Sequence, residues 1–386
     1  MPLFIFQPAP EAPTKLAVDV KDIEAIPLDI RPLPISGVLS VFVDERERVY
    51  AGLIGRAEVW RSSDGGRSWT KIFEDPDVKR VQSIYAVGNT IIVGTAGTPC
   101  RIWVSEDDGK SWSKAYEFKD GGYMRYIVED SDGRIYVNKA KFDAQVGTDV
   151  PELILMSEDG GKTWSEVYSK TAERWYGLHY DPWQDKIYFG GTAYLYRATP
   201  GFGTVESIIS SPGDVTAIQS GQGCRIWGCD GARGLRRTFN DSSFQILHQL
   251  HIVGDDPARF SYRGGHFTGA PLMLKVSPSG TLYAGTLPGS TVYGQLFASP
   301  DFGETWKLVL NTYSRAVHGI AFDRKGNVYI ACPYPKKDII PPYRLNMGLL
   351  LKMRDIRPFD IEPEPMWIDP IFYEAKIRDT NAHYSC

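Results

Sequence analysis

Arginines and aromatic residues stand at or just before several short apolar runs, and these residue types could hold an anionic ligand. Arg80 lies near Gln82, and Arg174 precedes an aromatic pair. A guanidinium group binds a carboxylate through two parallel hydrogen bonds and also stacks on aromatic rings. The alternative is that these arginines are solvated at junctions or pair with acids in adjacent turns. The candidate ligand-binding residues are Arg80, Gln82, Arg125, Arg174, Trp175, Tyr176, His266, Arg315, His318, Tyr343 and Arg344.

Acidic residues on the expected loops offer a second chemistry. Glycosidic bonds are hydrolysed by a pair of carboxyl groups, and Asp143, Asp149, Glu173 and Asp338 lie on suitable loops. Solvated loop acids are the alternative, and the sequence singles out no pair. Catalytic residues are therefore not assigned.

A β-rich phrase that recurs seven times predicts the elements that position these residues. The intervals of 42, 44, 52, 39, 56 and 46 residues suit one four-stranded unit each. The copies are ERVYAG around Tyr50, NTIIVG around Ile92, GRIYVN around Tyr136, DKIYFG around Tyr188, CRIWGC around Trp227, GTLYAG around Tyr283 and GNVYIA around Tyr329.

Further apolar runs flank each phrase, so each unit reads as short strands separated by Gly, Asp and Pro. A lone four-stranded sheet cannot bury both faces, and radial stacking of seven sheets makes one core with short edges. We therefore expect an all-β chain that forms a single seven-bladed β-propeller of four-stranded antiparallel blades.

Four units carry the same turn after their third strand. The turns run from Ser62 to Trp69, Ser105 to Trp112, Ser157 to Trp164 and Ser299 to Trp306. An Asp carboxylate can accept backbone N–H groups in a tight turn, Gly supplies positive φ, and Trp buries a large apolar body. This pattern resembles the Asp-box of sialidases and related bacterial-neuraminidase-repeat propellers.

The resemblance implies that the Asp-box is a structural hairpin on the face away from the ligand site. The structural residues it implies are Asp64, Trp69, Asp107, Trp112, Asp159, Trp164, Asp301 and Trp306. Three units depart from the pattern. In the fourth unit Gly201 stands where the Asp belongs, and in the fifth the turn at 238–244 is one residue short. The seventh unit keeps only Asp355. We expect these turns to be held by other means.

A sialidase would also need three arginines for the substrate carboxylate, a tyrosine nucleophile and an Asp acid. Arg125, Arg174 and Arg315 could form the triad, and Tyr343 or Tyr262 could supply the tyrosine. Ile30-Arg31-Pro32 is similar to the arginine-isoleucine-proline motif near the start of that family's propellers, but the order of the residues is altered. Nothing in the sequence chooses among these residues.

Two segments compete to supply the last strand of the ring. The N-terminal stretch 24–30 matches the way other units connect, whereas the tail 356–367 carries three prolines, which remove ladder donors. We expect closure by the N-terminal strand. The predicted parts are a Pro-rich arm at 1–16, the propeller at 17–355 and a C-terminal extension at 356–386.

Loops that join the second strand to the third gather on the face opposite the Asp-boxes, and a ligand site is expected there. The longest of these loops are Asn138 to Pro151, Thr286 to Gly294 and Pro333 to Gly348. Long loops on a rigid framework commonly serve binding or assembly.

Composition limits the partners. Lys+Arg number 43 against 47 Asp+Glu, which gives no basic footprint for nucleic acid. No apolar run is long enough to insert in a membrane, and the N-terminus lacks the pattern of a secretory signal. The five cysteines form no Cys-x-x-Cys pair, so we expect neither zinc nor a disulfide framework, and we expect Cys224 and Cys229 in the core.

The favoured function is a non-catalytic binding or assembly propeller whose loop face meets a protein or a glycan. The arm 1–16 and the extension 356–386 could support homo- or hetero-oligomers. The alternatives are a sialidase-like glycoside hydrolase and an assembly factor that docks on a larger complex. Family analogy suggests an extracellular or virion-surface location. We expect no cofactor.

Overall fold

The chain is built from short antiparallel strands. The computed structural model describes residues 24–26, 37–142, 149–171, 175–192, 194–210, 214–229, 235–248, 269–288, 294–304, 306–312, 314, 316–333 and 349–356. Within these ranges the only helical element is the short 3-10 turn η3 (Pro200–Phe202). No helix in the same ranges is long and apolar enough to cross a membrane.

Strands pair antiparallel in groups of four, and short pairings between neighbouring groups join the first three groups into one twelve-stranded sheet. The first group is β2 (Gly37–Val43), β3 (Val49–Ile54), β4 (Ala57–Ser62) and β5 (Thr70–Asp75). The second group is β6 (Arg80–Val87), β7 (Thr90–Gly97), β8 (Cys100–Ser105) and β9 (Ser113–Phe118). The third group is β10 (Gly122–Glu129), β11 (Ile135–Ala140), β12 (Glu152–Ser157) and β13 (Ser165–Lys170).

The same arrangement continues along the chain. The fourth group is β14 (Gly177–Asp181), β15 (Lys186–Gly190), β16 (Tyr194–Ala198) and β17 (Val205–Ser210). The fifth group is β18 (Val215–Gly221), β19 (Cys224–Cys229), β20 (Leu235–Thr238) and β21 (Gln245–His248). The sixth group is β22 (Gly269–Val276), β23 (Leu282–Pro288), β24 (Gln295–Ser299) and β25 (Lys307–Asn311).

The last group joins the two ends of the described chain. It contains β26 (Gly319–Phe322), β27 (Asn327–Cys332), β28 (Leu349–Arg354) and β1 (Glu24–Ile26). β1 pairs antiparallel with β28, with Glu24 opposite Lys352.

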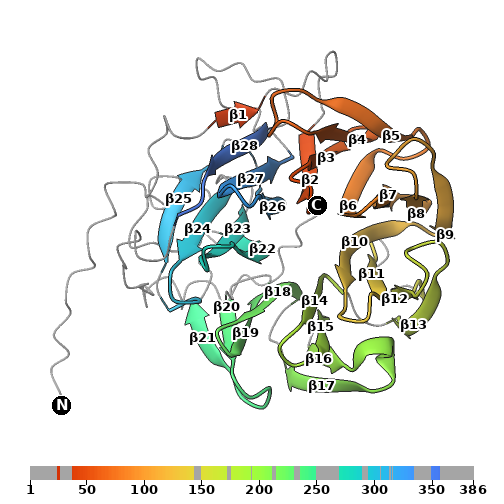
Figure 1. Ribbon diagram of the computed structural model, residues 1–386. Coiled ribbons are helices and arrows are strands. Elements are labelled where there is room, and N and C mark those ends of the chain that lie inside the picture. The colour runs from red at the N-terminus through yellow and green to blue at the C-terminus, as the bar shows by residue number, and fades with distance from the viewer. Residues whose placement is uncertain are drawn as a thin grey trace, which may run out of the picture.

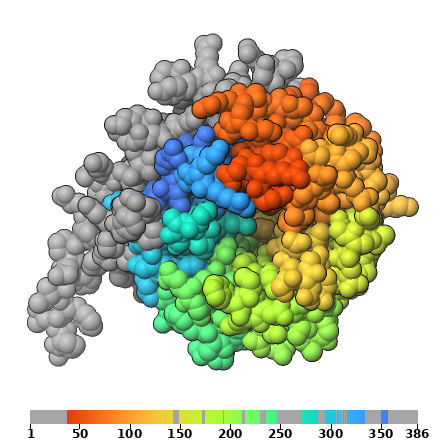
Figure 2. Space-filling view, in the orientation of Figure 1, coloured from red at the N-terminus to blue at the C-terminus, as the bar shows by residue number. Residues whose placement is uncertain are grey.

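The groups lie around a common centre, and the first strand of each group is nearest to it (Figure 1). These inner strands are β2, β6, β10, β14, β18, β22 and β26. Figure 2 shows that the middle of this arrangement is hollowed on the face toward the viewer. We call this hollow the central opening. Each inner strand turns into its neighbour at the same end as the predicted Asp-box turns, so the opposite end is the loop face.

The core lies between neighbouring groups. One apolar cluster joins Val59 and Phe73 of the first group to Val81 and Ile91 of the second. Another joins Val38 of the first group to Leu350 of the last. Because each sheet buries both faces against its neighbours, strands such as β3 and β11 are buried along their whole length.

Five inner strands carry a β-bulge near their start. The pairing register shifts between Val81 and Ser83, Met124 and Ile127, Val215 and Ala217, Pro271 and Met273, and Val38 and Ser40. A bulged residue leaves the ladder, and its side chain and carbonyl are re-aimed. The skipped residues include Gln82, Arg125, Tyr126, Thr216 and Leu272.

The predicted Asp-box turns have one hydrogen-bond pattern. Asp64 Oδ1 accepts the N–H groups of Arg67 and Ser68 at 2.9 Å, and Asp64 Oδ2 accepts the Ser68 hydroxyl at 2.6 Å. Asp107 and Asp159 repeat these contacts. Bonds from the Ser111 hydroxyl and amide lower the pKa of Asp107 to about 2. Asp301 accepts from the Ser299 hydroxyl at 2.9 Å.

The tryptophans that end these turns pack between the groups. Trp69 and Trp164 donate Nε1–H to the carbonyls of Gly66 and Gly161 at 3.0 and 2.9 Å, and Trp306 repeats this contact. Trp112 instead donates to Ile72 in the preceding group, at 2.7 Å. Gly161 has a φ of 92°, and a Cβ there would lie 2.5 Å from Ile92. Glycine is therefore required at this contact.

Two turns that depart from the Asp-box pattern are held by other side-chain oxygens. In the fifth group, Asn240 Oδ1 accepts the N–H groups of Ser242 and Ser243 at 3.1 Å, so an amide oxygen replaces the carboxylate. The expectation that this turn is held by other means than an Asp carboxylate is thus confirmed. In the fourth group, Thr199 Oγ1 accepts the Thr204 N–H at 3.0 Å.

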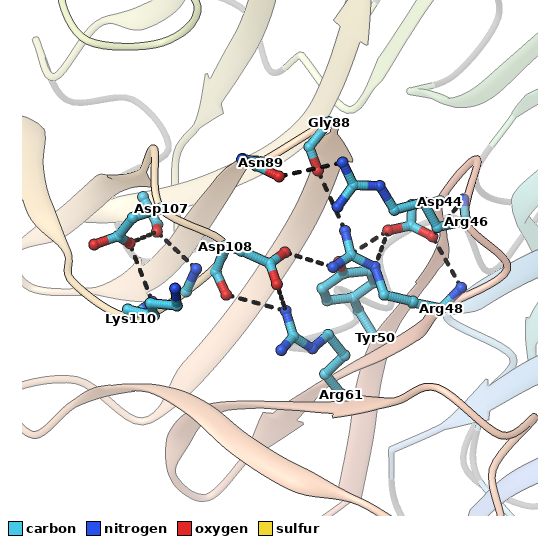
Figure 3. Close-up of polar contacts among 12 residues, drawn as sticks. Asp44, Arg46, Arg48, Tyr50, Arg61, Gly88, Asn89, Asp107, Asp108 and Lys110 are labelled. Atoms are coloured by element: carbon cyan, nitrogen blue, oxygen red, sulfur yellow. Dashed lines mark hydrogen bonds and ion pairs between the residues drawn. The ribbon is translucent and has the colours of Figure 1, made fainter.

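A recurring contact, which we call the clasp, joins the turn of one group to the preceding group at several places, and Figure 3 shows the one at Asp108. Asp108, the fourth residue of its turn, binds Arg48 at 2.5 Å and Arg61 at 3.0 Å in the preceding group. Asp241 holds the same turn position and binds Arg197 at 2.8 Å. Both Asp108 and Asp241 have positive φ, 63° and 59°.

The clasp also joins the last group to the first. Lys352 lies opposite Tyr329 in the ladder, as Arg61 lies opposite Tyr50. Its Nζ donates to the carbonyl of Gly65, the fourth residue of the first turn, at 3.1 Å. The end of the described chain therefore packs on its beginning.

Two of the loop predictions need correction. The strand β11 continues through Asn138 to Ala140, and β23 continues from Thr286 to Pro288, so both loops are shorter than expected. Asn138 is buried, accepts the Tyr126 N–H at 2.8 Å and donates to the Trp175 carbonyl at 2.9 Å. The side-chain amide of Asn138 thus accepts and donates hydrogen bonds as a backbone peptide group does in a strand ladder. The loop 334–348 lies outside the described residues.

Candidate binding site at the central opening

Arg80, Arg125 and His318 meet at the loop-face end of the opening. Arg80 begins β6, Arg125 lies in the bulge of β10, and His318 directly precedes β26. Burial and the positive charges of Arg125 and Arg80 lower the pKa of His318 to about 3, so its imidazole is neutral near pH 7. Around the centre, β2 lies between β26 and β6 (Figure 1), so His318 and Arg80 belong to groups that are not adjacent.

The guanidinium of Arg125 is positioned by aromatic rings. Its Cζ lies 4.7 Å from the ring centroid of Tyr176 and 5.8 Å from that of Tyr126. Stacking holds the plane of a guanidinium and leaves its N–H groups at the edge free for an acceptor. Arg125 is thus oriented between two tyrosine rings, and it also interacts with the side chain of Tyr126.

Tyr126 crosses the opening beside Arg125. Its hydroxyl lies 3.2 Å from the carbonyl of Thr216 and 3.0 Å from that of Leu272. Both carbonyls belong to bulged residues, so Tyr126 donates to groups that the bulges release from the ladder. We call this side chain the cross-bar, because it links β10 to β18 and β22.

In the part of the chain that the structure describes, no carboxylate forms an ion pair with Arg80 or Arg125. This contrasts with Arg48, Arg101, Arg134 and other arginines of the same sheets, which are paired. A cluster of partly enclosed, unpaired guanidinium groups attracts an anion.

The structure separates the predicted site residues. Arg80, Gln82, Arg125, Tyr176 and His318 are half-buried and lie on or next to inner strands. Trp175 is fully buried and stacks on Tyr168 with centroids 5.0 Å apart, so it belongs to the core and its ligand-binding prediction is wrong. Five others lie outside the described residues: Arg174, His266, Arg315, Tyr343 and Arg344.

The predicted acids and cysteines are only partly described. Asp143, Glu173 and Asp338 lie outside the described residues, as do Tyr262 and the Ile30-Arg31-Pro32 segment. Cys224 is buried in the core between the fifth and sixth groups, as predicted. The side chain of Cys229 is outside the described residues. In the described ranges, no three His, Cys, Asp or Glu side chains gather to hold a metal ion.

Sequence reasoning missed the cross-bar and a second set of polar residues on the inner strands. Tyr126, His179, Ser220 and Lys275 lie within otherwise apolar or alternating runs. Their only signal is position, because each follows the predicted start of an inner strand. The bulges of β10, β18 and β22 leave no trace in the sequence, and β14, which carries His179, pairs with β15 without a register shift.

This architecture is that of a β-propeller, in which antiparallel sheets surround a central axis. A virginiamycin B lyase from Staphylococcus aureus superposes with a TM-score of 0.63 at 12% identity, over 86% of this chain and 99% of the lyase. YCF48 bound to D1 peptide gives a TM-score of 0.59 at 17% identity, over 88% of this chain and 99% of YCF48. These likenesses establish the fold.

A GH74 xyloglucanase from Xanthomonas campestris gives a TM-score of 0.60 at 14% identity. The alignment covers 87% of this chain and 56% of the xyloglucanase, so the chain spans little more than half of that enzyme. The family model described as Sortilin, neurotensin receptor 3, matches residues 57–190. A search of the curated proteins finds no match.

Proposed function

We propose that this protein is a non-catalytic binding propeller whose loop face takes an acidic segment of a protein partner at the central opening. The observation that carries the proposal is that Arg80 and Arg125, together with neutral His318, have no carboxylate partner among the described residues. A carboxylate of the partner would neutralise these guanidinium groups. Recognition of a peptide is also what the name of the YCF48 complex describes for that propeller.

The framework of this proposal is a seven-bladed ring closed by β1. Support comes from the pairing of β1 with β28 and from the Lys352 clasp on Gly65. We propose that the Asp-box turns, including Asp64 and Asp159, are structural, because their carboxylates accept from their own turns. The arm 1–16 and the extension 356–386 would then lie beyond the ring and remain candidates for assembly contacts.

Binding can be tested with a dye-labelled hexaglutamate peptide in a fluorescence-anisotropy titration at low salt. Charge-assisted hydrogen bonds contribute about 1.5–3 kcal/mol each, so the variant Arg80→Gln/Arg125→Gln should bind at least tenfold more weakly. Arg67→Gln, which removes one exposed charge near the opposite pole, is the control and should bind like the wild type. Equal affinity of the double variant and the control would contradict the proposal.

Turnover provides an independent check of the non-catalytic reading. The protein is incubated with a panel of fluorogenic glycosides and polysaccharides, and product is measured for the wild type and for Arg125→Ala. We expect no turnover above a buffer blank. Product formation that disappears in the variant would replace the binding proposal with a glycoside hydrolase.

A further inference from the structure

A tryptophan stands exposed at the pole of the Asp-box turns, away from the loop face. Trp183 lies in the turn between β14 and β15, and its side chain is 85% exposed, more than any other large apolar side chain that the structure describes. Tryptophan is highly buried on average, because its ring carries a large apolar surface. An indole that a turn keeps in solvent is therefore a candidate contact for a ligand.

The turn that carries Trp183 is fixed by its own side chains. The Trp183 N–H donates to Asp181 Oδ1 at 2.9 Å, and the Tyr180 hydroxyl donates to Asp185 Oδ1 at 2.9 Å. Among the described residues, the indole Nε1–H has no acceptor. The protein thus presents the ring on an ordered backbone, which reduces the conformational entropy that binding a ligand would cost.

A turn of the next group lies directly beside this one. The fourth and fifth groups are neighbours around the centre (Figure 1). The Tyr188 hydroxyl lies 2.7 Å from Gln184 Oε1 and 2.7 Å from Asp241 Oδ2, so it joins the first turn to the turn between β20 and β21. Gln184 directly follows Trp183, and Asp241 directly follows Asn240. The two turns therefore form one continuous surface.

Each turn carries a side-chain amide with one unused end. One end of the Gln184 amide contacts the Tyr188 hydroxyl, and its other end has no partner among the described residues. Asn240 Oδ1 accepts the N–H groups of Ser242 and Ser243, whereas the Asn240 Nδ2 group has no partner in the same part of the chain. Both amides are exposed. They offer uncharged hydrogen-bonding groups on either side of the junction between the turns.

The guanidinium groups that contact Asp241 are satisfied within the protein. Arg197 binds Asp241 at 2.8 Å and Glu206 at 2.6 Å, and Arg225 is buried against Asp241. Phe239, directly before Asn240, is 52% exposed and adds a second apolar ring to the surface. The groups left to meet a ligand here are thus aromatic rings and amides, and they carry no charge.

We propose that Trp183, Gln184 and Asn240 form a binding site for a neutral oligosaccharide. The face of an indole ring packs on the polarised C–H groups of a sugar ring. Sugar hydroxyls both donate and accept, so they can use the free amide ends and the indole Nε1–H. An apolar protein partner would instead require a large contiguous apolar patch. The site lies at the pole opposite the loop face, so the inference does not depend on the acidic-peptide proposal.

Isothermal titration calorimetry of the full chain tests the site with three linear neutral probes: cellohexaose, maltohexaose and N-acetylchitohexaose. We expect at least one to bind. Trp183→Ala should weaken that binding at least tenfold, whereas Tyr194→Ala, which removes an exposed tyrosine at the start of β16 on the loop face, should bind like the wild type. Because Trp183 is exposed, its replacement should leave the urea midpoint unchanged. Unchanged affinity in Trp183→Ala, or no binding of any probe by the wild type, would overturn the proposal.

Two further comparisons separate a sugar site from an apolar contact. Trp183→Phe should retain more affinity than Trp183→Leu, because a sugar ring needs an aromatic face; equal affinity of the two variants contradicts the inference. The bound sugar should change the tryptophan emission of the wild type but not that of Trp183→Phe. Light scattering without sugar provides the alternative outcome: self-association that Trp183→Ala abolishes, in a protein that binds none of the probes, would make this surface an interface between copies. Arg125→Gln should retain sugar binding while losing the acidic peptide, so the two proposals can fail separately.

Discussion

Three ionisable side chains are almost entirely buried in the third group of strands: Lys139, Lys141 and Glu152. Glu152 Oε1 accepts the Lys141 N–H at 2.8 Å, and Glu152 Oε2 has no hydrogen-bond partner among the described residues. Lys139 donates to the Pro151 carbonyl at 2.8 Å and lies over the Phe118 ring. Burial raises the pKa of Glu152 to about 7 and lowers the pKa of Lys139. This cluster therefore destabilises the folded state to a degree that depends on pH.

Glu152→Gln should therefore stabilise the protein at pH 8 more than at pH 5. A carboxyl group whose pKa is raised on folding contributes most stability below its ordinary pKa and loses it as pH rises toward 7. Each pKa unit corresponds to about 1.4 kcal/mol. Urea denaturation at the two pH values measures the difference. Glu158→Gln, an exposed control, should show none, and a pH-independent effect at Glu152 would contradict the explanation.

At the residue scale, the strand pattern predicted that Arg80, Arg125 and His318 stand at or near the starts of inner strands, and their binding of a ligand stays a prediction. Trp175 has a similar place in the sequence and is nevertheless buried, because the direction of its side chain depends on packing against Tyr168. A direction that tertiary packing decides cannot be predicted from the strand pattern alone.

At the scale of strands and turns, the clasp explains a cluster of buried charge in the fifth group. Asp241 binds Arg225 at 2.5 Å and Arg197 at 2.8 Å, and it accepts the Tyr188 hydroxyl at 2.7 Å. Arg225 is only 2% exposed. One carboxylate thus compensates a buried guanidinium and joins the fourth group to the fifth.

Asp241→Asn should destabilise the protein by about 3–5 kcal/mol, the usual cost of leaving a buried charge without its partner. The free energy of unfolding from urea denaturation checks this value. Asp132→Asn removes one exposed partner of Arg134 and should cost less than about 1 kcal/mol. Similar losses in the two variants would show that Asp241 is not the compensating group.

The turns show how far a motif predicts an element. Ser, Asp, Gly and Trp at fixed spacing predicted the hairpins correctly, because every contact of Asp64 or Asp159 is local. At Asn240 an amide oxygen accepts the same N–H groups, an alternative that a motif written for Asp does not specify. The clasps of Asp108 and Asp241 join residues 44 to 60 positions apart and could not be predicted from either partner alone.

At the scale of the whole molecule, the recurring phrases predicted the all-β architecture because each copy is one middle strand of a repeated unit. The register of β1 on β28 connects the two ends of the chain, and no local pattern fixes such a pairing. Its prediction rested on the prolines that disqualify the competing tail.

Removal of residues 1–26 should destabilise the ring by about 2–4 kcal/mol, because it takes away the hydrogen bonds of β1 and exposes the edge of β28. Removal of residues 1–16 alone should leave the free energy of unfolding unchanged. Urea denaturation and light scattering of both truncations give the comparison. If both deletions behave alike, a different segment completes the last sheet.

Neighbouring sheets contact one another at similar positions, but the chemical type of the contact differs from place to place. The fourth residue of the turn makes this contact through a carboxylate at Asp108 and through a peptide carbonyl at Gly65. One position later in another turn, Gly161 packs against the side chain of Ile92. Substitution can therefore replace an ion pair by a dipolar or an apolar contact while the arrangement of neighbouring sheets persists. Chains of low sequence identity can accordingly share this fold, as the superpositions at 12–17% identity show.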